Sequence, residues 1–496
     1  MTKSQIPNPK KAETILGFGF LVLGLGLWVL GFGILSVAQA VKTNIPYADA
    51  KPILDVLQEN LLPAELKGKT PAELAKLWPD WVARRDAIIR ARVEQGDEDS
   101  VIHFLLFGTL FTKAPLARDD ELAALVARPA EAAPSSLRAR IDDFIAAVAS
   151  AGTNERLLFA RQVVARKGID PTTEAGKNQM RRYLEERTRS YANTALQSQK
   201  AILSNPGGES LDRRTLFRDR GLTFNTSIFV NLAIEQTLDA IKVKGLLRPG
   251  SVRRVAIVGP GLEFTDKQDG YDFYPPQTIQ PFAVIDSLIR LGLSKPTPGE
   301  LEVTAFDLSP GIIQHLEAAR GRARSGSPYT LVLPRNLDRP WTPSLVKSWK
   351  AFGNYIGEET KAELPPGSQV RLKADTTGSA GRVEVRSILV RPSVVLSMVS
   401  RDLNIVLQRV EPLPANNQFD VIVATNILIY YDVFEQSLAV ANIAKMLRRG
   451  GFFLTNDRIF ELPNSPIGFV GSTDVNYMVL PGLGETGDRI TWYQRN

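Results

Sequence analysis

The chain contains 496 residues, and a chain of this length usually forms two or three domains. Hydrophobic residues make up 44% of it and charged residues 23%, a balance that excludes intrinsic disorder as the default state. The formal net charge of +7, from 60 Lys and Arg against 53 Asp and Glu, is mild for this length, so we expect no nucleic-acid partner.

The side chains that most often bind metals are scarce. Cysteine is absent, which excludes disulfides, thiolate nucleophiles and cysteine-ligated metal centres. Only His103 and His315 carry imidazole groups, so we expect no metal site. Acid–base chemistry would fall to Asp, Glu, Tyr or Lys.

Residues 15–38 contain no charge and follow a basic tail formed by residues 1–14. As a helix this run would measure about 36 Å, enough to cross a bilayer core of roughly 30 Å. The alternative is a secretory signal, because residues 38–40 read Ala-Gln-Ala, like a cleavage site. The apolar run is longer than a usual signal core, which favours an uncleaved, single-pass membrane anchor.

Glycines in this segment repeat every seven residues and would form stripes along a helix. They are Gly17, Gly24 and Gly31, with a second set at Gly19, Gly26 and Gly33. Small residues at this spacing allow close helix packing in lipid, so a homo-oligomer could form through the segment. The basic tail predicts an N-terminus inside the cell, which would place the rest of the chain outside.

Residues 45–230 are predicted to form a helical domain. The sequence Thr-Pro-Ala-Glu at residues 70–73 has an N-cap, a proline at the first helical position and a capping-box glutamate. An apolar patch at residues 101–111 is too short to cross a bilayer and is typical of a core helix.

From about residue 231 the pattern changes to alternating helices and strands. An amphipathic helix is predicted at residues 232–244, and parallel strands at 255–258, 302–306, 404–408 and 419–424. Residues 321–400 fit this alternation poorly and are predicted to be an insertion, with a hairpin near residues 376–381. The region 231–496 is therefore expected to be an α/β domain.

The first predicted strand ends in Gly259-Pro260-Gly261, a turn that would open a helix and let the backbone approach a ligand closely. A dinucleotide fingerprint needs a third small residue, where Glu263 stands here. It also needs an acid about 20 residues on, whereas Asp307 follows Gly261 by 307 − 261 = 46 residues. A nicotinamide or flavin enzyme is therefore disfavoured, but a glycine turn with a ribose-binding acid remains.

Residues 419–456 carry a longer pattern. It consists of Phe419-Asp420, Asn426, Leu428-Ile429-Tyr430-Tyr431-Asp432, Gln436, Leu447 and Gly450-Gly451. This stretch resembles class I S-adenosylmethionine-dependent methyltransferases, and is most similar to the chemotaxis-receptor glutamate methyltransferases. Thr425 stands where that family usually has arginine, so the receptor-glutamate substrate does not carry over. The resemblance implies a doubly wound Rossmann-like methyltransferase domain, preceded here by a transmembrane helix and an all-α N-terminal domain.

The resemblance also implies S-adenosylmethionine as the cofactor and assigns residues to it. The implied cofactor-binding set is Gly259, Pro260, Gly261, Glu263, Asp307, Leu308, Asn426 and Ile427. In this arrangement the methionine end of the cofactor lies against the glycine turn, the ribose against Asp307, and Asn426 faces the sulfonium. The alternative for Asn426 is a helix cap for the segment that follows it.

The loop after the glycine turn offers a possible lid or acceptor site, formed by Tyr271, Asp272, Tyr274 and Gln277. Its alternative is a surface loop whose aromatic side chains pack on the sheet. The sequence thus predicts a membrane-anchored methyltransferase-like protein with an unidentified acceptor. The rival hypothesis is a catalytically silent Rossmann-like module for binding or assembly at a membrane.

Overall fold

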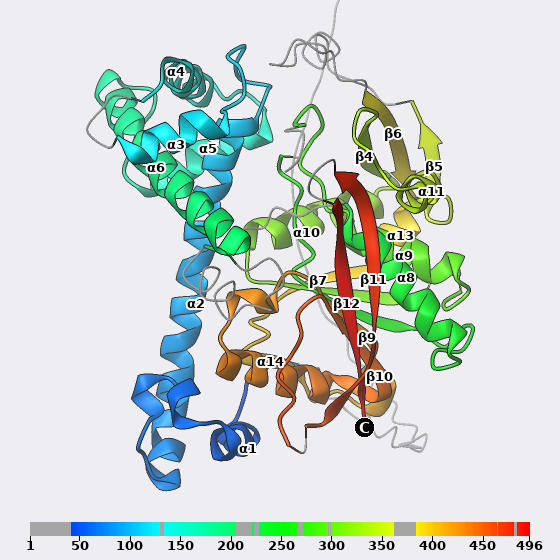
Figure 1. Ribbon diagram of the computed structural model, residues 1–496. Coiled ribbons are helices and arrows are strands. Elements are labelled where there is room, and N and C mark those ends of the chain that lie inside the picture. The colour runs from blue at the N-terminus through cyan, green and yellow to red at the C-terminus, as the bar shows by residue number, and fades with distance from the viewer. Residues whose placement is uncertain are drawn as a thin grey trace, which may run out of the picture. The chain divides into compact units, whose positions relative to one another are not determined.

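The computed structural model describes residues 41–496 apart from 129–132, 205–220, 223–227, 266–270, 296, 298, 362–382, 464 and 481–483 (Figure 1). Residues 40–496 form one compact unit. The predicted tail and membrane segment, residues 1–38, lie outside the described residues and stay predictions. In the part of the chain that is described, no helix combines the length and apolar character needed to cross a membrane.

A mixed sheet of seven strands forms the centre of this unit, in the order β11-β12-β10-β9-β2-β3-β7. Its strands are β2 (Arg254–Val258), β3 (Glu302–Asp307), β7 (Met398–Asp402), β9 (Phe419–Ala424), β10 (Leu447–Thr455), β11 (Ile467–Leu480) and β12 (Gly484–Arg495). The first five are mutually parallel and lie in the order third, second, first, fourth, fifth. This is the order of a doubly wound fold, which the structure therefore confirms. An antiparallel hairpin, β11 and β12, completes one edge.

Helices cover both faces of the sheet and create two apolar cores (Figure 1). The helices concerned are α8 (Val230–Val243), α9 (Gln280–Arg290) and α10 (Pro310–Arg324) in one core, and α14 (Val433–Met446) in the other. Val255 and Ile257 of β2 belong to the first core, and Ala256 and Val258 to the second. All four side chains are buried, as a continuous apolar run predicts for a parallel strand covered on both faces.

The third parallel strand differs from the prediction. We expected it at residues 404–408, but β7 spans Met398–Asp402. The apolar residues Ile405, Val406 and Leu407 are buried in a turn that packs into the second core, so burial alone produced a strand-like pattern.

A small antiparallel sheet, in the order β4-β6-β5, lies between α10 and β7 in the chain. This part comprises β4 (Tyr329–Asn336), α11 (Pro343–Ala351), β5 (Gly357–Thr360), β6 (Val383–Val390) and α13 (Pro392–Leu396). It falls within the range expected for the insertion. The hairpin expected near residues 376–381 lies outside the described residues.

Helices dominate the described residues before α8, as the sequence predicts. They are α1 (Tyr47–Val56), α2 (Pro71–Phe107), α3 (Asp119–Ala127), α4 (Ser135–Ala149), α5 (Glu155–Arg166) and α6 (Glu174–Ser204). The capping box of Thr70 and Glu73 starts α2. This helix has 37 residues and also contains most of the apolar patch that we expected to form a helix of its own.

These helices do not form a separate unit, so the predicted all-α N-terminal domain is not confirmed. The first half of α2 places Trp78 and Trp81 in the second core, against Phe434 of α14. Its second half places Phe104 in the first core, which also contains apolar residues of α3 to α6. The Phe104 ring packs there against Phe144 of α4. Figure 1 shows α2 as a long rod that joins these two regions. A short strand, β1 (Val41–Asn44), pairs with β8 (Gln408–Glu411) in a separate two-stranded antiparallel sheet.

Candidate functional site

The glycine turn after β2 has the backbone geometry that the sequence predicts. Gly259 and Gly261 have φ values of 67° and 70°, in the left-handed region that other residues rarely adopt. A Cβ atom on Gly259 would lie 2.2 Å from Cδ1 of Ile427, so this glycine also makes room for a neighbouring side chain. The turn lies between β3 and β9, where the strand order reverses, which is the usual ligand position in doubly wound sheets.

The expectation that the turn opens a helix is wrong for the described residues. Helix α9 begins only at Gln280. Glu263 instead pairs with Gln277 in an antiparallel bridge, with backbone hydrogen bonds of 2.7 and 3.2 Å. The Gln277 amide also donates to the Glu263 carboxylate at 2.6 Å and to the Val332 carbonyl at 2.7 Å. Both side chains are buried, so they fasten the loop to the insertion.

Asp307 stands at the carboxyl end of β3, next to the glycine turn in the sheet. The backbone N–H of Ser309 donates to its Oδ1 at 2.8 Å, and no side chain among the described residues donates to it. The pKa of Asp307 is raised to about 7, mainly because burial disfavours the charged form; the backbone amides of Ser309 and Leu308 oppose this rise, and the nearby Asp402 adds to it. The remaining acceptor positions of this carboxylate are thus free for a ligand with hydroxyl donors. Leu308 follows it into α10 and is half-buried.

Asn426 lies at the carboxyl end of β9, across the switch point from Asp307. Its φ of 58° is left-handed, which is uncommon outside glycine. It does not cap a helix, because Asp432 is the N-cap of α14. Instead its backbone N–H donates to Asn456 at 2.7 Å and its side-chain oxygen accepts from Asn456 at 2.6 Å, which ties the ends of β9 and β10 together.

All four predicted lid or acceptor residues make structural contacts, and three of them are buried. Asp272 is fully buried and accepts from the N–H and hydroxyl of Thr109 at 2.7 and 2.6 Å, and from the N–H of Leu110 at 3.0 Å. Tyr274 is buried, and Gln277 belongs to the bridge described above. Only Tyr271 is half-buried, with its ring against Phe273. The alternative, in which the aromatic residues pack, fits this loop better than an open acceptor site.

The sequence reasoning missed Arg156, at the start of α5. Its guanidinium is buried and donates to the carbonyls of Phe264 and Tyr274, and it lies 5.6 Å from the centre of each of those rings. Burial lowers its pKa. No local pattern could have revealed this role, because the partners are carbonyl groups more than 100 positions away in the chain.

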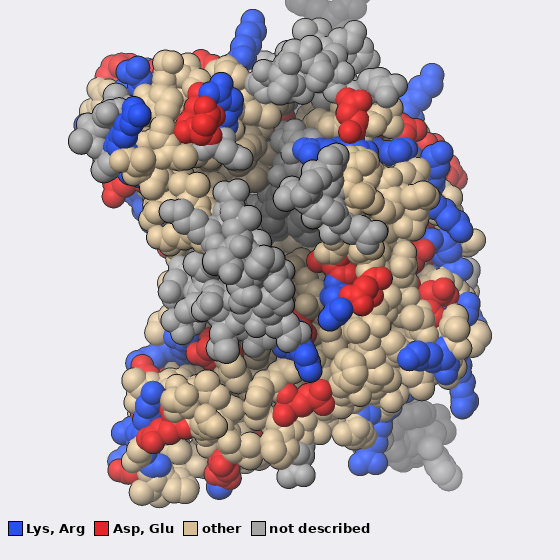
Figure 2. All heavy atoms as spheres, viewed as in Figure 1, with Lys and Arg blue, Asp and Glu red and all other residues tan. Residues whose placement is uncertain are grey.

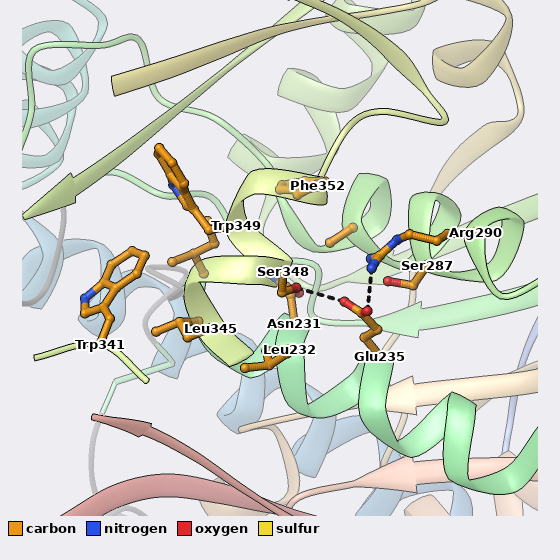
Figure 3. Close-up of a pocket in the computed structure, with 12 residues that line it drawn as sticks. Asn231, Leu232, Glu235, Ser287, Arg290, Trp341, Leu345, Ser348, Trp349 and Phe352 are labelled. Carbon is orange, nitrogen blue, oxygen red and sulfur yellow. Dashed lines mark hydrogen bonds and ion pairs between the residues drawn. The ribbon is translucent and has the colours of Figure 1, made fainter. Parts of the chain in front are cut away.

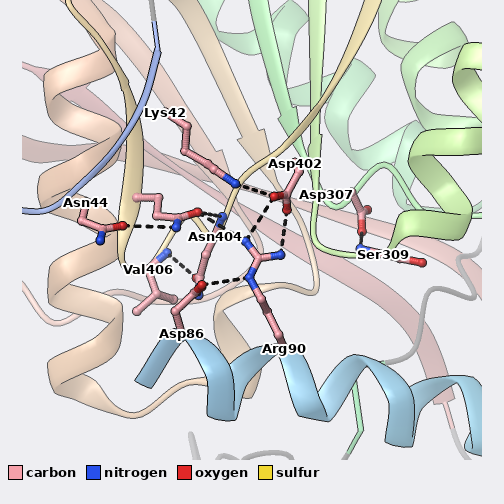
Figure 4. Close-up of polar contacts among 10 residues, drawn as sticks. Lys42, Asn44, Asp86, Arg90, Asp307, Ser309, Asp402, Asn404 and Val406 are labelled. Carbon is pink, nitrogen blue, oxygen red and sulfur yellow. Dashed lines mark hydrogen bonds and ion pairs between the residues drawn. The ribbon is translucent and has the colours of Figure 1, made fainter. Parts of the chain in front are cut away.

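A second group that the sequence reasoning missed surrounds Asp402, which ends β7 and pairs with Asp307 across the sheet (Figure 4). Asp402 accepts from Lys42 of β1 at 2.5 Å and from both terminal nitrogens of Arg90 of α2 at 2.8 and 3.3 Å. Burial alone would raise the pKa of Asp402, but these two cations lower it. Asp86, one turn before Arg90, holds the same guanidinium at 2.9 Å.

Two hollows lined by described residues lie away from the glycine turn. The smaller, of about 30 Å³, lies between α8, α9 and α11, where Glu235 accepts from Arg290 at 2.5 Å and from Ser348 at 2.8 Å (Figure 3). It has room for about one water molecule. The larger, of about 640 Å³, is an open groove beside α11. Neither contains a residue that the sequence assigned to the cofactor.

Charges on the outside show no single-sign patch on the visible face, where Lys and Arg alternate with Asp and Glu (Figure 2). Among the described residues there is no group of three or more His, Asp or Glu side chains that could hold a metal ion.

No family model and no curated protein sequence matches the chain. Among solved structures, it is similar to magnesium protoporphyrin IX methyltransferase from Synechocystis PCC 6803 with bound S-adenosylmethionine, at 12% identity and a TM-score of 0.22. That match covers 60% of this chain and 97% of the other. It is also similar to human N-acetylserotonin methyltransferase in complex with S-adenosylmethionine, at 11% identity and a TM-score of 0.22, over 88% and 100% of the two chains.

A third similar structure is the glycopeptide N-methyltransferase MtfA complexed with sinefungin, at 11% identity and a TM-score of 0.20. The match covers 53% of this chain and 66% of that protein. The TM-score, which measures structural similarity, is low in all three cases. The doubly wound fold of this chain is established by its own strand order and connections.

Proposed function

We propose that the chain is a membrane-anchored S-adenosylmethionine-dependent methyltransferase-like protein whose acceptor is still to be identified. The observation that carries the proposal is the pairing of a left-handed glycine turn with the Asp307 carboxylate on the neighbouring strand, at the switch point of a doubly wound sheet. When bound, S-adenosylmethionine supplies a methyl group already activated by its sulfonium. The protein then has mainly to orient the acceptor and exclude water.

The residues at this point of the sheet fit a nucleoside cofactor. Asp307 has acceptor capacity that no described side chain uses, which suits the two hydroxyls of a ribose. Gly259 is half-buried and has no side chain, which suits the methionine end, while Gly261 is buried behind it and its carbonyl accepts from the Thr278 hydroxyl at 3.0 Å. Ile427 packs over the turn from β9 and gives it an apolar wall.

The same geometry argues against a dinucleotide. Pyrophosphate groups bind at helix N-termini, where backbone N–H groups and the helix dipole favour negative charge. Here α9 begins at Gln280, well after the turn, and Glu263 places a buried carboxylate in the intervening loop. S-adenosylmethionine carries no phosphate, so it does not need the missing helix end.

The catalytically silent alternative has one observation in its favour. Among the predicted acceptor residues, the side chains of Asp272 and Gln277 are engaged in structural contacts and Tyr274 is buried, so these three are not open to a substrate. Methyl transfer needs little acid–base help, so this observation does not by itself decide between the two functions.

The membrane part of the proposal rests on residues 15–38, whose uncharged run is long enough to span a bilayer. We propose that this segment anchors the chain and that its glycine stripes allow two copies to pair. Reporter fusions at the two ends of the chain would test the anchor and determine on which side of the membrane the fold lies.

The cofactor proposal is tested by calorimetric titration of the full chain in detergent with S-adenosylmethionine, S-adenosylhomocysteine and NAD at pH 8, where Asp307 is ionised. We expect the first two to bind and NAD not to bind. Asp307→Ala should weaken binding at least about tenfold, because charge-assisted hydrogen bonds contribute about 1.5–3 kcal/mol each. Asp239→Ala, which removes an exposed aspartate of α8, is the matched control and should leave binding unchanged.

Absence of binding by both sulfur compounds to a folded sample would overturn the proposal. Binding without transfer of labelled methyl groups to any component of a membrane extract would instead support the silent module.

A further inference from the structure

We infer that Arg90 of α2 and Lys42 of β1 are positioning residues of the cofactor site. They neutralise Asp402, so that the adjacent Asp307 can serve as the carboxylate that receives the ribose. The inference deepens the proposed function, on which it rests, and gives the helical region before the sheet a role in that site. Figure 4 shows the group, which joins β1, α2, β3 and β7.

The geometry places two carboxylates side by side. Asp307 and Asp402 end the neighbouring parallel strands β3 and β7 in direct register. Like charges at this separation repel, and each disfavours ionisation of the other. Asp402 nevertheless stays ionised more easily, because it pairs with two cations: Lys42 at 2.5 Å and Arg90 at 2.8 and 3.3 Å. Among the described residues, the donors to Asp307 are backbone N–H groups and no cation pairs with it.

Arg90 is held in place more firmly than Lys42. Asp86 anchors the Arg90 guanidinium from within α2 at 2.9 Å, and Gln408 of β8 accepts from it at 3.5 Å. Asn404, which follows β7, donates to the other oxygen of Asp86 at 2.7 Å. Arg90 is therefore part of a fixed network, whereas Lys42 is a single and more exposed contact, with 40% of its side chain open to solvent.

The charged and titratable groups that face the pair come from every element packed around it. They are Asp307 itself, Asp402, Arg90, Asp86, Lys42 and, beyond β9, Tyr431. Arg90 and Lys42 are the cations of this group among the residues that the structure describes. Without them Asp402 would present an uncompensated charge to Asp307 and oppose its ionisation, and a protonated Asp307 can accept fewer hydrogen bonds from a diol.

The test compares wild type with the double variant Arg90→Ala/Lys42→Ala in two assays across pH 5.5–9. The first assay needs no ligand: the difference in unfolding temperature between Asp307 and Asp307→Asn forms reports where Asp307 ionises. The difference stops growing near the pKa of Asp307 in the folded protein, and we expect the pH at which it stops growing to rise by about one unit in the double variant. The second assay titrates S-adenosylhomocysteine, whose affinity at pH 7 should fall about fivefold, because that is the loss of ionised Asp307 when its pKa rises from about 7 by one unit, and the loss should shrink toward pH 9.

Two further variants separate charge from structure. Arg90→Lys should restore most of the wild-type pH profile, because it keeps the cation. Lys76→Ala/Arg84→Ala removes two exposed cations of the same helix, with the same change of net charge as the double variant, and should leave both profiles unmoved.

The outcomes are distinct for the two proposals. If the stability difference in the first assay stops growing at the same pH in both proteins, or if the affinity loss is equal at every pH, the role assigned to Arg90 and Lys42 is overturned. If that pH rises in a protein that binds no S-adenosylhomocysteine, the role is supported as a property of the fold and the cofactor proposal alone is overturned.

Discussion

Replacement of Asp307 by asparagine should stabilise the ligand-free protein at neutral and alkaline pH. The carboxylate stands at a half-buried position with two backbone donors and a neighbouring acid, and its pKa is raised from 3.8 to about 7. An amide of the same shape can still accept from Ser309 at 2.8 Å but carries no charge. We expect the ligand-free wild-type protein to be less stable than the Asp307→Asn variant, because the wild-type carboxylate serves ligand binding at the expense of stability.

The magnitude follows from proton linkage. A raised carboxyl pKa means that the folded chain binds more protons than the unfolded chain between about pH 4 and pH 7, so wild-type stability falls across that window. Three pKa units correspond to a ceiling of about 4 kcal/mol. Because Asp307 is partly open to water, screening reduces this to about 1–2 kcal/mol. The Asp307→Asn advantage should thus be near zero at pH 4, grow to pH 7 and stay constant above.

Thermal unfolding at a fixed scan rate, in buffers of equal ionic strength from pH 4 to pH 9, measures the difference. For a chain of this size about 1–2 kcal/mol corresponds to a few degrees. Asp402→Asn is the control, since it makes the same charge change on the next strand but removes the pairs with Arg90 and Lys42. It should lower stability. A destabilised Asp307→Asn variant at pH 8 would refute the reasoning.

Two other substitutions test the glycine turn and the loop that follows it. Gly259→Ala should lose about 2–4 kcal/mol and abolish cofactor binding, because its Cβ would meet Ile427 at 2.2 Å in a left-handed conformation. Gly292→Ala, which is equally left-handed but has no atom within 4 Å, should lose only about 1–2 kcal/mol in urea unfolding, and equal losses would contradict the packing argument. Asp272→Asn should cost about 1–3 kcal/mol, because the carboxylate accepts three hydrogen bonds, while the affinity of the folded fraction for S-adenosylhomocysteine stays the same. A large loss of affinity without loss of stability would restore Asp272 to the ligand site.

The sheet could be predicted where strands are buried on both faces. The strands that contain Val255–Val258 and Phe419–Ala424 are continuous apolar runs, and the structure has them within a residue of the expected bounds. β7 could not be recognised in this way, because it lies at the edge of the sheet and pairs only with β3. Its sequence Met-Val-Ser-Arg-Asp is buried only at Met398, so the apolar turn beyond it gave the stronger signal.

The candidate site could likewise be predicted only where local sequence determines it. Positions that need a backbone property or a strand end, such as Gly259, Gly261 and Asp307, can be found from local sequence, because the chain itself supplies the strand before them. The contacts that hold the site together could not be found. Arg156 reaches carbonyl groups of a distant loop, and Arg90 reaches Asp402 over a separation of 312 positions. Pairs of residues this far apart in the chain leave no periodic pattern or motif in the sequence.

The same long-range contacts explain why the helical region is not a separate domain. Along its 37 residues, α2 packs Trp81 against Phe434, pairs Arg90 with Asp402, and leads into Thr109, which holds Asp272. One rigid element thus reaches the helix after β9, the end of β7 and the loop after the glycine turn. The end of β7 lies beside Asp307, and the loop follows the glycine turn, so a change in the position of α2 would alter the candidate cofactor site from both of these directions. We therefore regard α2 as part of the site, and the sheet alone as an incomplete version of it.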